Sequence, residues 1–186
     1  MKTFITTCIF AFLISFSSFA QLDKGYWLGS VEGSLAVTGS RSYWTINMNP
    51  HLMKLVNKNL AVGLSADFSY FKSNSTYFNG TTSFGPYSEF NLEIGPVARK
   101  YFGNSKLKPY VELGTGILIY KWNYKNAENS GLNETHYKYY LNPTIGLSYW
   151  MNDRVSINLS TGYNILNFKE VNSTGVKIGV SFKLGK

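Results

Sequence analysis

The chain has 186 residues, a net charge of +8 at pH 7 and 17% aromatic residues, a length that fits one domain. Its single cysteine, Cys8, lies near the N-terminus, so the rest of the chain has no disulfide framework, thiolate nucleophile or cysteine metal site. The basic residues are spread along the chain without a stripe or binding motif, which argues against nucleic acid as a partner and favours a solvated surface that also contacts anionic lipid headgroups.

The N-terminal segment has the features of a secretory signal peptide. Lys2 precedes an apolar run over 4–16, and small residues occupy the positions before a cleavage site after Ala20. The run is short for a transmembrane anchor, which is the alternative. We therefore predict a signal peptide over 1–20 and one mature domain over 21–186.

Eight segments alternate apolar and polar residues with a period of two, the pattern of strands with one apolar and one polar face. The third is the clearest, because Leu64 and Phe68 lie on its apolar side and Asp67 on its polar side. In chain order the predicted strands are 26–38, 43–53, 60–71, 90–102, 108–120, 135–150, 155–163 and 174–184.

The connections between these strands alternate between short turns and generally longer loops. The short turns are 57–59, 103–106 and 152–153, and the other connections are 39–41, 72–86, 121–134 and 164–172. Strands of about 9–11 residues are long enough to cross a bilayer. The pattern predicts an all-β, eight-stranded antiparallel up-and-down transmembrane barrel, with its apolar face toward lipid, its polar face inside and its short turns in the periplasm.

Three prolines conflict with uninterrupted strands. Pro50, Pro96 and Pro143 lie on the apolar faces, and a proline cannot donate a hydrogen bond to a neighbouring strand. We therefore expect local β-bulges at these positions.

With its alternating strands and the segments IGPVARKYF at 94–102 and KPYVELG at 108–114, the mature chain resembles the small eight-stranded outer-membrane barrels of the OmpA/OmpX type, in the short form common in Bacteroidetes-like bacteria. This resemblance implies a monomer in the cell outer membrane, surrounded by lipid and without a cofactor.

An eight-stranded barrel is just wide enough inside for its own side chains. The inward-facing charged residues are Glu32, Asp67, Glu93, Arg99, Glu112, Lys138 and Lys177. Arg99 lies opposite or diagonal to Glu112 in either plausible register of the hairpin over 90–120. Because buried charges must be paired, we predict an interior polar network in a plugged, partly wet lumen without an open pore, with an ion or proton path as the alternative.

Catalysis and metal binding find little support. A lipid hydrolase or acyltransferase needs a histidine beside a serine and an acid. His51 and His136 are the only histidines, and no nucleophile motif or metal-ligand cluster accompanies them. We therefore predict no enzyme, no metal and no cofactor, with a lipid-modifying enzyme as an alternative.

A secreted, lipocalin-like binder of apolar ligands is a further alternative, because 25–27 matches its Gly-x-Trp start. It would place the apolar faces inside, whereas Trp44, Tyr70 and Tyr149 lie near strand ends, as in the aromatic belts at a membrane interface.

The outer loops are the predicted place of function. Tyr77, Phe78, Trp122 and Tyr124, with their polar neighbours, are candidate contacts for a surface glycan or a protein partner. A purely structural role in the membrane is the alternative.

Overall fold

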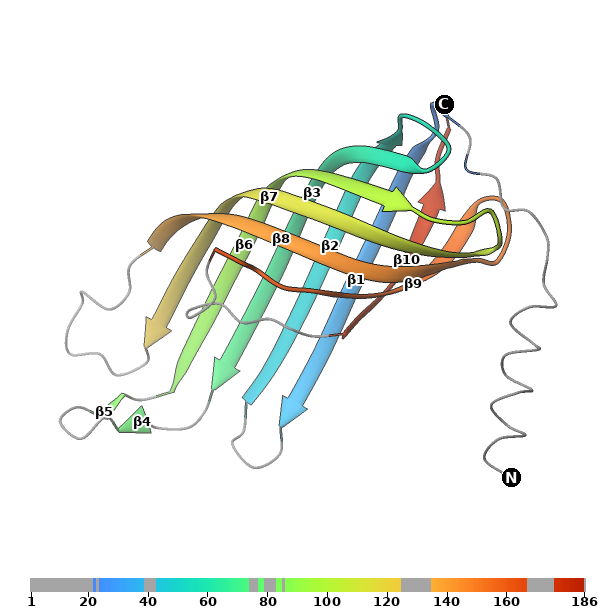
Figure 1. Ribbon diagram of the computed structural model, residues 1–186. Helices are drawn as coiled ribbons and strands as arrows, with labels where there is room; N and C mark the ends of the chain where they lie inside the picture. The colour runs from blue at the N-terminus through green and yellow to red at the C-terminus, as the bar shows by residue number, and fades with distance from the viewer. Residues whose placement is uncertain are drawn as a thin grey trace, which may run out of the picture.

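The computed structural model is a closed antiparallel β-barrel of eight strands (Figure 1), which confirms the predicted fold. It describes residues 22, 24–38, 43–73, 77–78, 83–84, 86–124, 135–166 and 176–185, so the predicted signal peptide lies outside the described residues. The barrel strands are β1 (Trp27–Thr38), β2 (Tyr43–Leu55), β3 (Leu60–Ser73), β6 (Tyr87–Tyr101), β7 (Leu107–Tyr124), β8 (Thr135–Trp150), β9 (Val155–Gly162) and β10 (Val176–Lys183). Neighbours follow the order β1-β10-β9-β8-β7-β6-β3-β2, so the first and last strands close the ring.

Several strands extend further toward the loops than predicted. β7 continues to Tyr124, whose backbone pairs with that of Tyr87 at the start of β6. The predicted loop over 72–86 also contains a small hairpin, in which β4 (Tyr77–Phe78) pairs with β5 (Ser83–Phe84). Hydrogen bonds between strands join backbone groups and do not require apolar side chains. The strands can therefore continue beyond the point where apolar and polar residues stop alternating.

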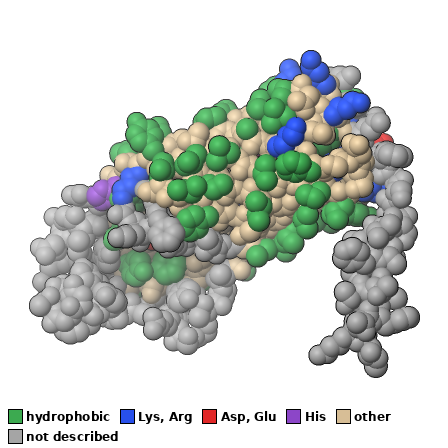
Figure 2. Space-filling model, viewed as in Figure 1, with side chains coloured by type: hydrophobic (Ala, Val, Ile, Leu, Met, Phe, Trp, Pro, Cys, Tyr) green, Lys and Arg blue, Asp and Glu red, His purple; other side chains and the backbone are tan. Residues whose placement is uncertain are grey.

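The wall of the barrel is apolar on the outside. Leu35, Leu64, Ile145 and Ile178 each have more than 60% of their surface exposed, and apolar side chains cover much of the wall in Figure 2. The middle of the interior instead holds buried polar side chains, such as those of Glu32, Arg99 and Asn158. This inside-out arrangement is that of a transmembrane barrel and excludes the lipocalin-like alternative, which needs an apolar interior. Among the described residues, no helix is long and apolar enough to cross a membrane.

The expected bulges at the prolines are wrong, because the strand register stays constant past each of them. Between β2 and β3, Met48 pairs with Phe68 and His51 pairs with Ser65, so both strands have equal numbers of residues around Pro50. Registers past the other two prolines are equally constant. At Pro50 and Pro96 the missing N–H lies in a two-residue gap in the pairing with one neighbouring strand, and at Pro143 the pairing of β8 with β9 ends at Thr144. No residue is inserted at any of the three positions.

The gap beside Pro96 depends on two glycines that face each other across β6 and β7. A Cβ at Gly95 would lie 2.0 Å from the backbone oxygen of Thr115, and one at Gly116 would lie 2.2 Å from that of Ile94. Gly116 also has a φ of +151°, which side chains rarely adopt. The two strands therefore approach each other closely at a point where only glycine fits.

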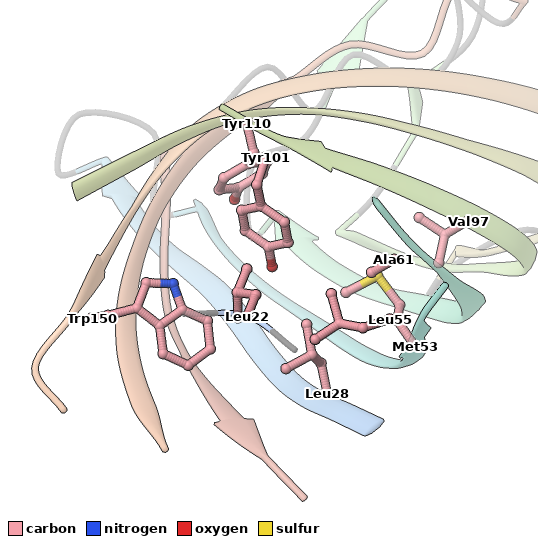
Figure 3. Packing of buried hydrophobic residues seen from close by; sticks show 9 residues of the cluster. All are labelled: Leu22, Leu28, Met53, Leu55, Ala61, Val97, Tyr101, Tyr110 and Trp150. Atoms are coloured by element: carbon pink, nitrogen blue, oxygen red, sulfur yellow. The ribbon is translucent and has the colours of Figure 1, made fainter. Parts of the chain in front are cut away.

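An apolar cluster fills the lumen at the end that carries the short turns (Figure 3). Its members are Leu22, Leu28, Met53, Leu55, Ala61, Val97, Tyr101, Tyr110 and Trp150. Side chains of β1, β2, β3, β6, β7 and β8 meet there, together with Leu22 from the segment before β1. The interior is thus apolar at one end and polar beyond it, a division that the sequence analysis did not anticipate.

Candidate functional site

The polar part of the lumen is organised around Arg99 of β6, whose side chain is fully buried. Its Nε donates to Glu112 Oε2 on β7 at 2.5 Å, and its Nη2 donates to Glu32 Oε1 on β1 at 2.8 Å. Arg99 and Glu112 are direct partners in the β6–β7 register. The guanidinium also lies 4.2 Å from the ring centre of Tyr110, a cation–π contact. One buried cation therefore joins two carboxylates from separate strands.

Glu32 receives further donors from β7 and β9. Ser160 Oγ on β9 donates to Glu32 Oε2 at 2.5 Å, and Tyr110 Oη donates to Oε1 at 3.2 Å. Tyr110 can lie there because its neighbour on β8 is Gly146, where a Cβ would be only 2.3 Å from Tyr110 Cζ. The network, named here the Arg99 cluster, therefore connects β1, β6, β7 and β9.

His51 of β2 is also part of the Arg99 cluster, a contact that the sequence analysis missed. Its Nδ1 lies 2.9 Å from Ser30 Oγ and 3.4 Å from Arg99 Nη2, and its Nε2 lies 3.6 Å from Glu112 Oε1. Because Arg99 can only donate, Nδ1 acts as an acceptor and Nε2 carries the ring proton. The resulting Ser30–His51–Glu112 arrangement resembles a hydrolytic triad in composition, and all three residues are buried.

A second group of charges, named here the Lys177 cluster, lies nearer the loops. Lys177 Nζ on β10 donates to Asp67 Oδ2 on β3, and Asn49 Nδ2 donates to the same oxygen at 2.7 Å. Asp67 is the direct register partner of Glu93 on β6, which accepts from Asn164 Nδ2 at 2.9 Å. Two carboxylates on adjacent strands are thus held by one ammonium and two amides.

A cavity of about 20 Å³ separates the two clusters. Its lining includes Glu32, His51 and Glu112 from one side and Asp67, Glu93 and Lys177 from the other. Asn49 and Asn142 also line the cavity, and their side-chain amide oxygens (Oδ1) have no hydrogen-bond partner in the protein. The volume suits about one water molecule. Over the described residues, the lumen at this height is therefore filled by side chains apart from a water-sized space.

Lys138 lies apart from both clusters, near the loop end of β8. Its ammonium is 5.3 Å from the ring centre of Tyr120, which in turn stacks on His136 at 4.9 Å. Because Lys138 shares the face of the other interior charges, we predicted that it belongs to the same polar network. The structure brings the remaining members into the two clusters and places Lys138 beside aromatic rings instead.

The predicted loop contacts are only partly visible. Trp122, at the end of β7, is exposed, and its ring lies 6.4 Å from that of Tyr120. Tyr77, Phe78 and Tyr124 belong to β4 and β7, but their side chains lie outside the described residues. Within the described part of the chain, no group of three or more His, Cys, Asp or Glu residues could hold a metal ion.

A closed barrel with an apolar outer wall and a filled polar lumen defines the class: a transmembrane β-barrel of the type found in bacterial outer membranes. Among solved structures, the outer membrane protein OprG from Pseudomonas aeruginosa is similar over 91% of this chain and 100% of its own, with 12% identity and a TM-score of 0.55. The chain thus shares the fold of a small outer-membrane protein.

Two further structures have lower TM-scores. The N-terminal barrel domain of Pseudomonas aeruginosa OprF aligns over 88% of this chain and all of its own, with 15% identity and a TM-score of 0.47. Neisserial surface protein A aligns over 86% of this chain and 96% of its own, with 17% identity and a TM-score of 0.47. No family model matches the chain, and neither does any curated protein.

Proposed function

We propose that the protein is an integral outer-membrane barrel without an open pore, which acts as a structural component of the membrane and through contacts made by its extracellular loops. The observation that carries this proposal is the filled lumen. The apolar cluster occupies one end, and the Arg99 cluster joins five strands, β1, β2, β6, β7 and β9, across the middle. In such a barrel the outer wall contacts lipid and the loops contact molecules outside the cell, while the interior side chains stabilise the fold.

The two ends of the barrel support an orientation in the membrane. Short turns join β2 to β3, β6 to β7 and β8 to β9 at one end, where the C-terminus also lies (Figure 1). The other connections lie at the opposite end, and all of them except the one between β1 and β2 are longer. In bacterial barrels the short turns face the periplasm and the longer loops face outward. The loop end, with Trp122, Tyr124, Tyr77 and Phe78, is therefore the surface that we assign to contacts with a glycan or a protein.

Membrane location and closure can be tested together. Cell fractionation should place the mature chain in the outer membrane, and its unboiled band should migrate differently from its boiled band on a detergent gel. Mass spectrometry of the isolated protein should give a chain that begins at Gln21. In planar bilayers the protein should give no steady ion conductance. A soluble periplasmic protein, or a stable open channel, would contradict the proposal.

The loop contacts need a separate experiment. Whole cells that display the protein should be screened on glycan arrays and on immobilised extracellular proteins. Trp122→Ala combined with Tyr124→Ala should lower any binding that is found, because aromatic side chains provide contact area at low entropic cost. Trp44→Ala is the control, since Trp44 is an exposed aromatic residue of the outer wall. Equal losses in both variants would argue against a role for the loops.

The Ser30–His51–Glu112 arrangement does not lead us to propose catalysis. An ester or acyl chain would have to enter the lumen to reach Ser30 Oγ, and the nearby cavity has room for about one water. Activity-based labelling with a fluorophosphonate is the direct test. We expect no covalent adduct on Ser30, and an adduct lost in Ser30→Ala would revive the alternative of a lipid-modifying enzyme.

A further inference from the structure

We propose that the short-turn end of the barrel binds an anionic phospholipid of the adjacent leaflet, with an acyl chain in a groove on the outer wall of β7, β8 and β9 and the headgroup phosphate on Lys106 and Arg154. The proposal goes beyond the role of the loops, and it rests on the proposed function only for the statement that this end meets the periplasmic leaflet.

The groove is an open, apolar depression of about 410 Å³ in the outer wall. Its apolar lining residues are Phe102, Pro109, Val111, Ile145, Leu147, Leu159 and Val176. Pro109, Leu147 and Leu159 are register partners across β7, β8 and β9, so the groove crosses three adjacent strands. Gly146 and Ser160, inward-facing residues of β8 and β9, also line it.

Two basic residues lie in the short turns that lead into β7 and β9, two of the strands that carry this groove. Lys106 ends the β6–β7 turn, and its backbone oxygen accepts the N–H of Trp150 at 2.9 Å, which brings the two turns of this region together. Arg154 ends the β8–β9 turn, next to Val155 at the start of β9. Lys106 precedes Pro109 by three residues, which is about 10 Å along a strand. A phosphate between the turns can therefore place its first methylene groups at the groove.

The same combination of residues occurs in each short turn. An exposed apolar side chain comes first, and a basic side chain follows two to four positions later. The pairs are Val56 with Lys58, Phe102 with Lys106 and Met151 with Arg154. A long basic side chain with an apolar neighbour suits the membrane interface, where the apolar group lies among acyl chains and the cation reaches the phosphate layer.

The charge at this end is strongly one-sided. The described basic residues here include Lys24, Lys54, Lys58, Lys100, Lys106 and Arg154, whereas Asp153 is the one acidic residue among the described residues of the three turns. No salt bridge within the described residues involves Lys58, Lys100, Lys106 or Arg154. On the face in Figure 2, most Lys and Arg side chains gather at the end near the C-terminus.

Lys106 and Arg154, which have no salt-bridge partner among the described residues, should favour some lipids over others by the charge of the headgroup. A headgroup with a net negative charge satisfies them, whereas a zwitterionic headgroup brings its own ammonium to the same place. The apolar groove beside Lys106 and Arg154 adds a chain-binding element that free phosphate cannot use. The occupant that fits both features is a phospholipid such as phosphatidylglycerol.

The test is lipid retention by the purified, folded barrel. The protein is equilibrated in detergent micelles with equal amounts of phosphatidylglycerol and phosphatidylethanolamine, and bound lipid is measured by native mass spectrometry. We expect preferential retention of phosphatidylglycerol. Lys106→Gln with Arg154→Gln should reduce it by about fivefold for each charge removed. Lys72→Gln with Lys121→Gln removes the same charge from exposed positions at the other end and should leave retention unchanged.

A groove variant separates the chain site from simple charge attraction. Leu159→Trp fills the groove without changing the charge, and it should lower retention of phosphatidylglycerol while leaving retention of glycerol phosphate unchanged and weak. Leu35→Trp, on the outer wall of β1, is the matched control. Heat-shifted migration on a detergent gel shows that each variant is folded.

Equal retention of the two lipids, or equal losses from the two charge pairs, would overturn the lipid site. Neither result would bear on the location of the barrel in the outer membrane or on the closure of its lumen, which fractionation and conductance test separately.

Discussion

The Arg99 and Lys177 clusters both bind a cation to carboxylates inside the same barrel, but they do so in different surroundings. Arg99 is fully buried, bridges Glu32 and Glu112, and lies against the ring of Tyr110. The side chains of Lys177 and Asp67 keep 12% and 13% of their surface exposed. The apolar cluster lies on the short-turn side of Arg99, whereas the Lys177 cluster lies toward the loops.

This difference indicates that access to water determines how much an interior ion pair contributes to the stability of the barrel. If Arg99 is removed, the carboxylates of Glu32 and Glu112 stay in a region that the apolar cluster shields from solvent. Their negative charge is then balanced neither by a cation nor by water. If Lys177 is removed, water can approach Asp67 and replace part of the lost contact. Similar ion pairs should therefore contribute unequally to the stability of the barrel, and the following variants measure that inequality.

The largest effect is expected for Arg99→Met. Leaving buried carboxylates without their partner should reduce the free energy of unfolding by about 3–5 kcal/mol. Urea titration of the barrel folded in lipid vesicles is the measurement. The triple variant Arg99→Met, Glu32→Gln, Glu112→Gln should recover much of the loss, because it removes the unpaired charges together. A triple variant that is less stable than Arg99→Met would show that packing, not charge, accounts for the effect.

Leu64→Arg should have the next largest effect, on the outer wall instead of the lumen. An arginine on the lipid face near the middle of the bilayer costs about 2–4 kcal/mol. Ser65, the next residue, points into the lumen, and Ser65→Ala is the control with an effect near zero. The same vesicle titration applies. Normal stability of Leu64→Arg would mean that the inner and outer faces are reversed, and the comparison of interior clusters would then fail.

Lys177→Met should cost less than Arg99→Met. Asp67 keeps its hydrogen bond from Asn49 and gains water, so we expect a loss of about 1–3 kcal/mol, the usual cost of removing one partner of a buried polar group. A loss equal to that of Arg99→Met would show that both halves of the lumen are equally dry.

The smallest effect is expected for Lys138→Met. Its contact with the Tyr120 ring is a cation–π pair near the loop end, where such pairs contribute about 0.5–1 kcal/mol. Chemical denaturation in vesicles should detect little change. A loss larger than that of Lys177→Met would place Lys138 in a tighter network than its position on β8 indicates.

Local patterns in the sequence were enough to predict the strands and the direction of each face. Period-two alternation identifies which side of a strand faces lipid, and the turn at 103–106 brings Arg99 and Glu112 together because they are close in the chain. The contacts of Arg99 with Glu32 and of Glu32 with Ser160 span 67 and 128 positions. Such pairs depend on the closure of the whole ring, which no local pattern encodes.

Two other features could have been found from signals in the sequence. Leu28, Met53, Tyr101 and Trp150 occupy positions of the inward face close to short turns, so an apolar cluster at that end was visible as a change in the inward residues. The gap at Pro96 could have been inferred from Gly95 beside it and Gly116 on the following strand. His51 was assigned to the polar face, but its partners come from β1, β6 and β7, which the pattern of β2 alone does not reveal.

The pairing of β1 with β10, from Leu28 with Lys183 to Gly33 with Ile178, has a consequence for how the protein is made. The partners belong to the first and last strands of the barrel, so the ring cannot close until the last strand has been synthesised. An unpaired strand edge in hydrocarbon leaves backbone groups unsatisfied at a cost of several kcal/mol each. Bringing distant segments together is also slow. An open sheet is therefore unstable inside the hydrocarbon layer, and insertion of the strands has to be coupled to closure of the ring.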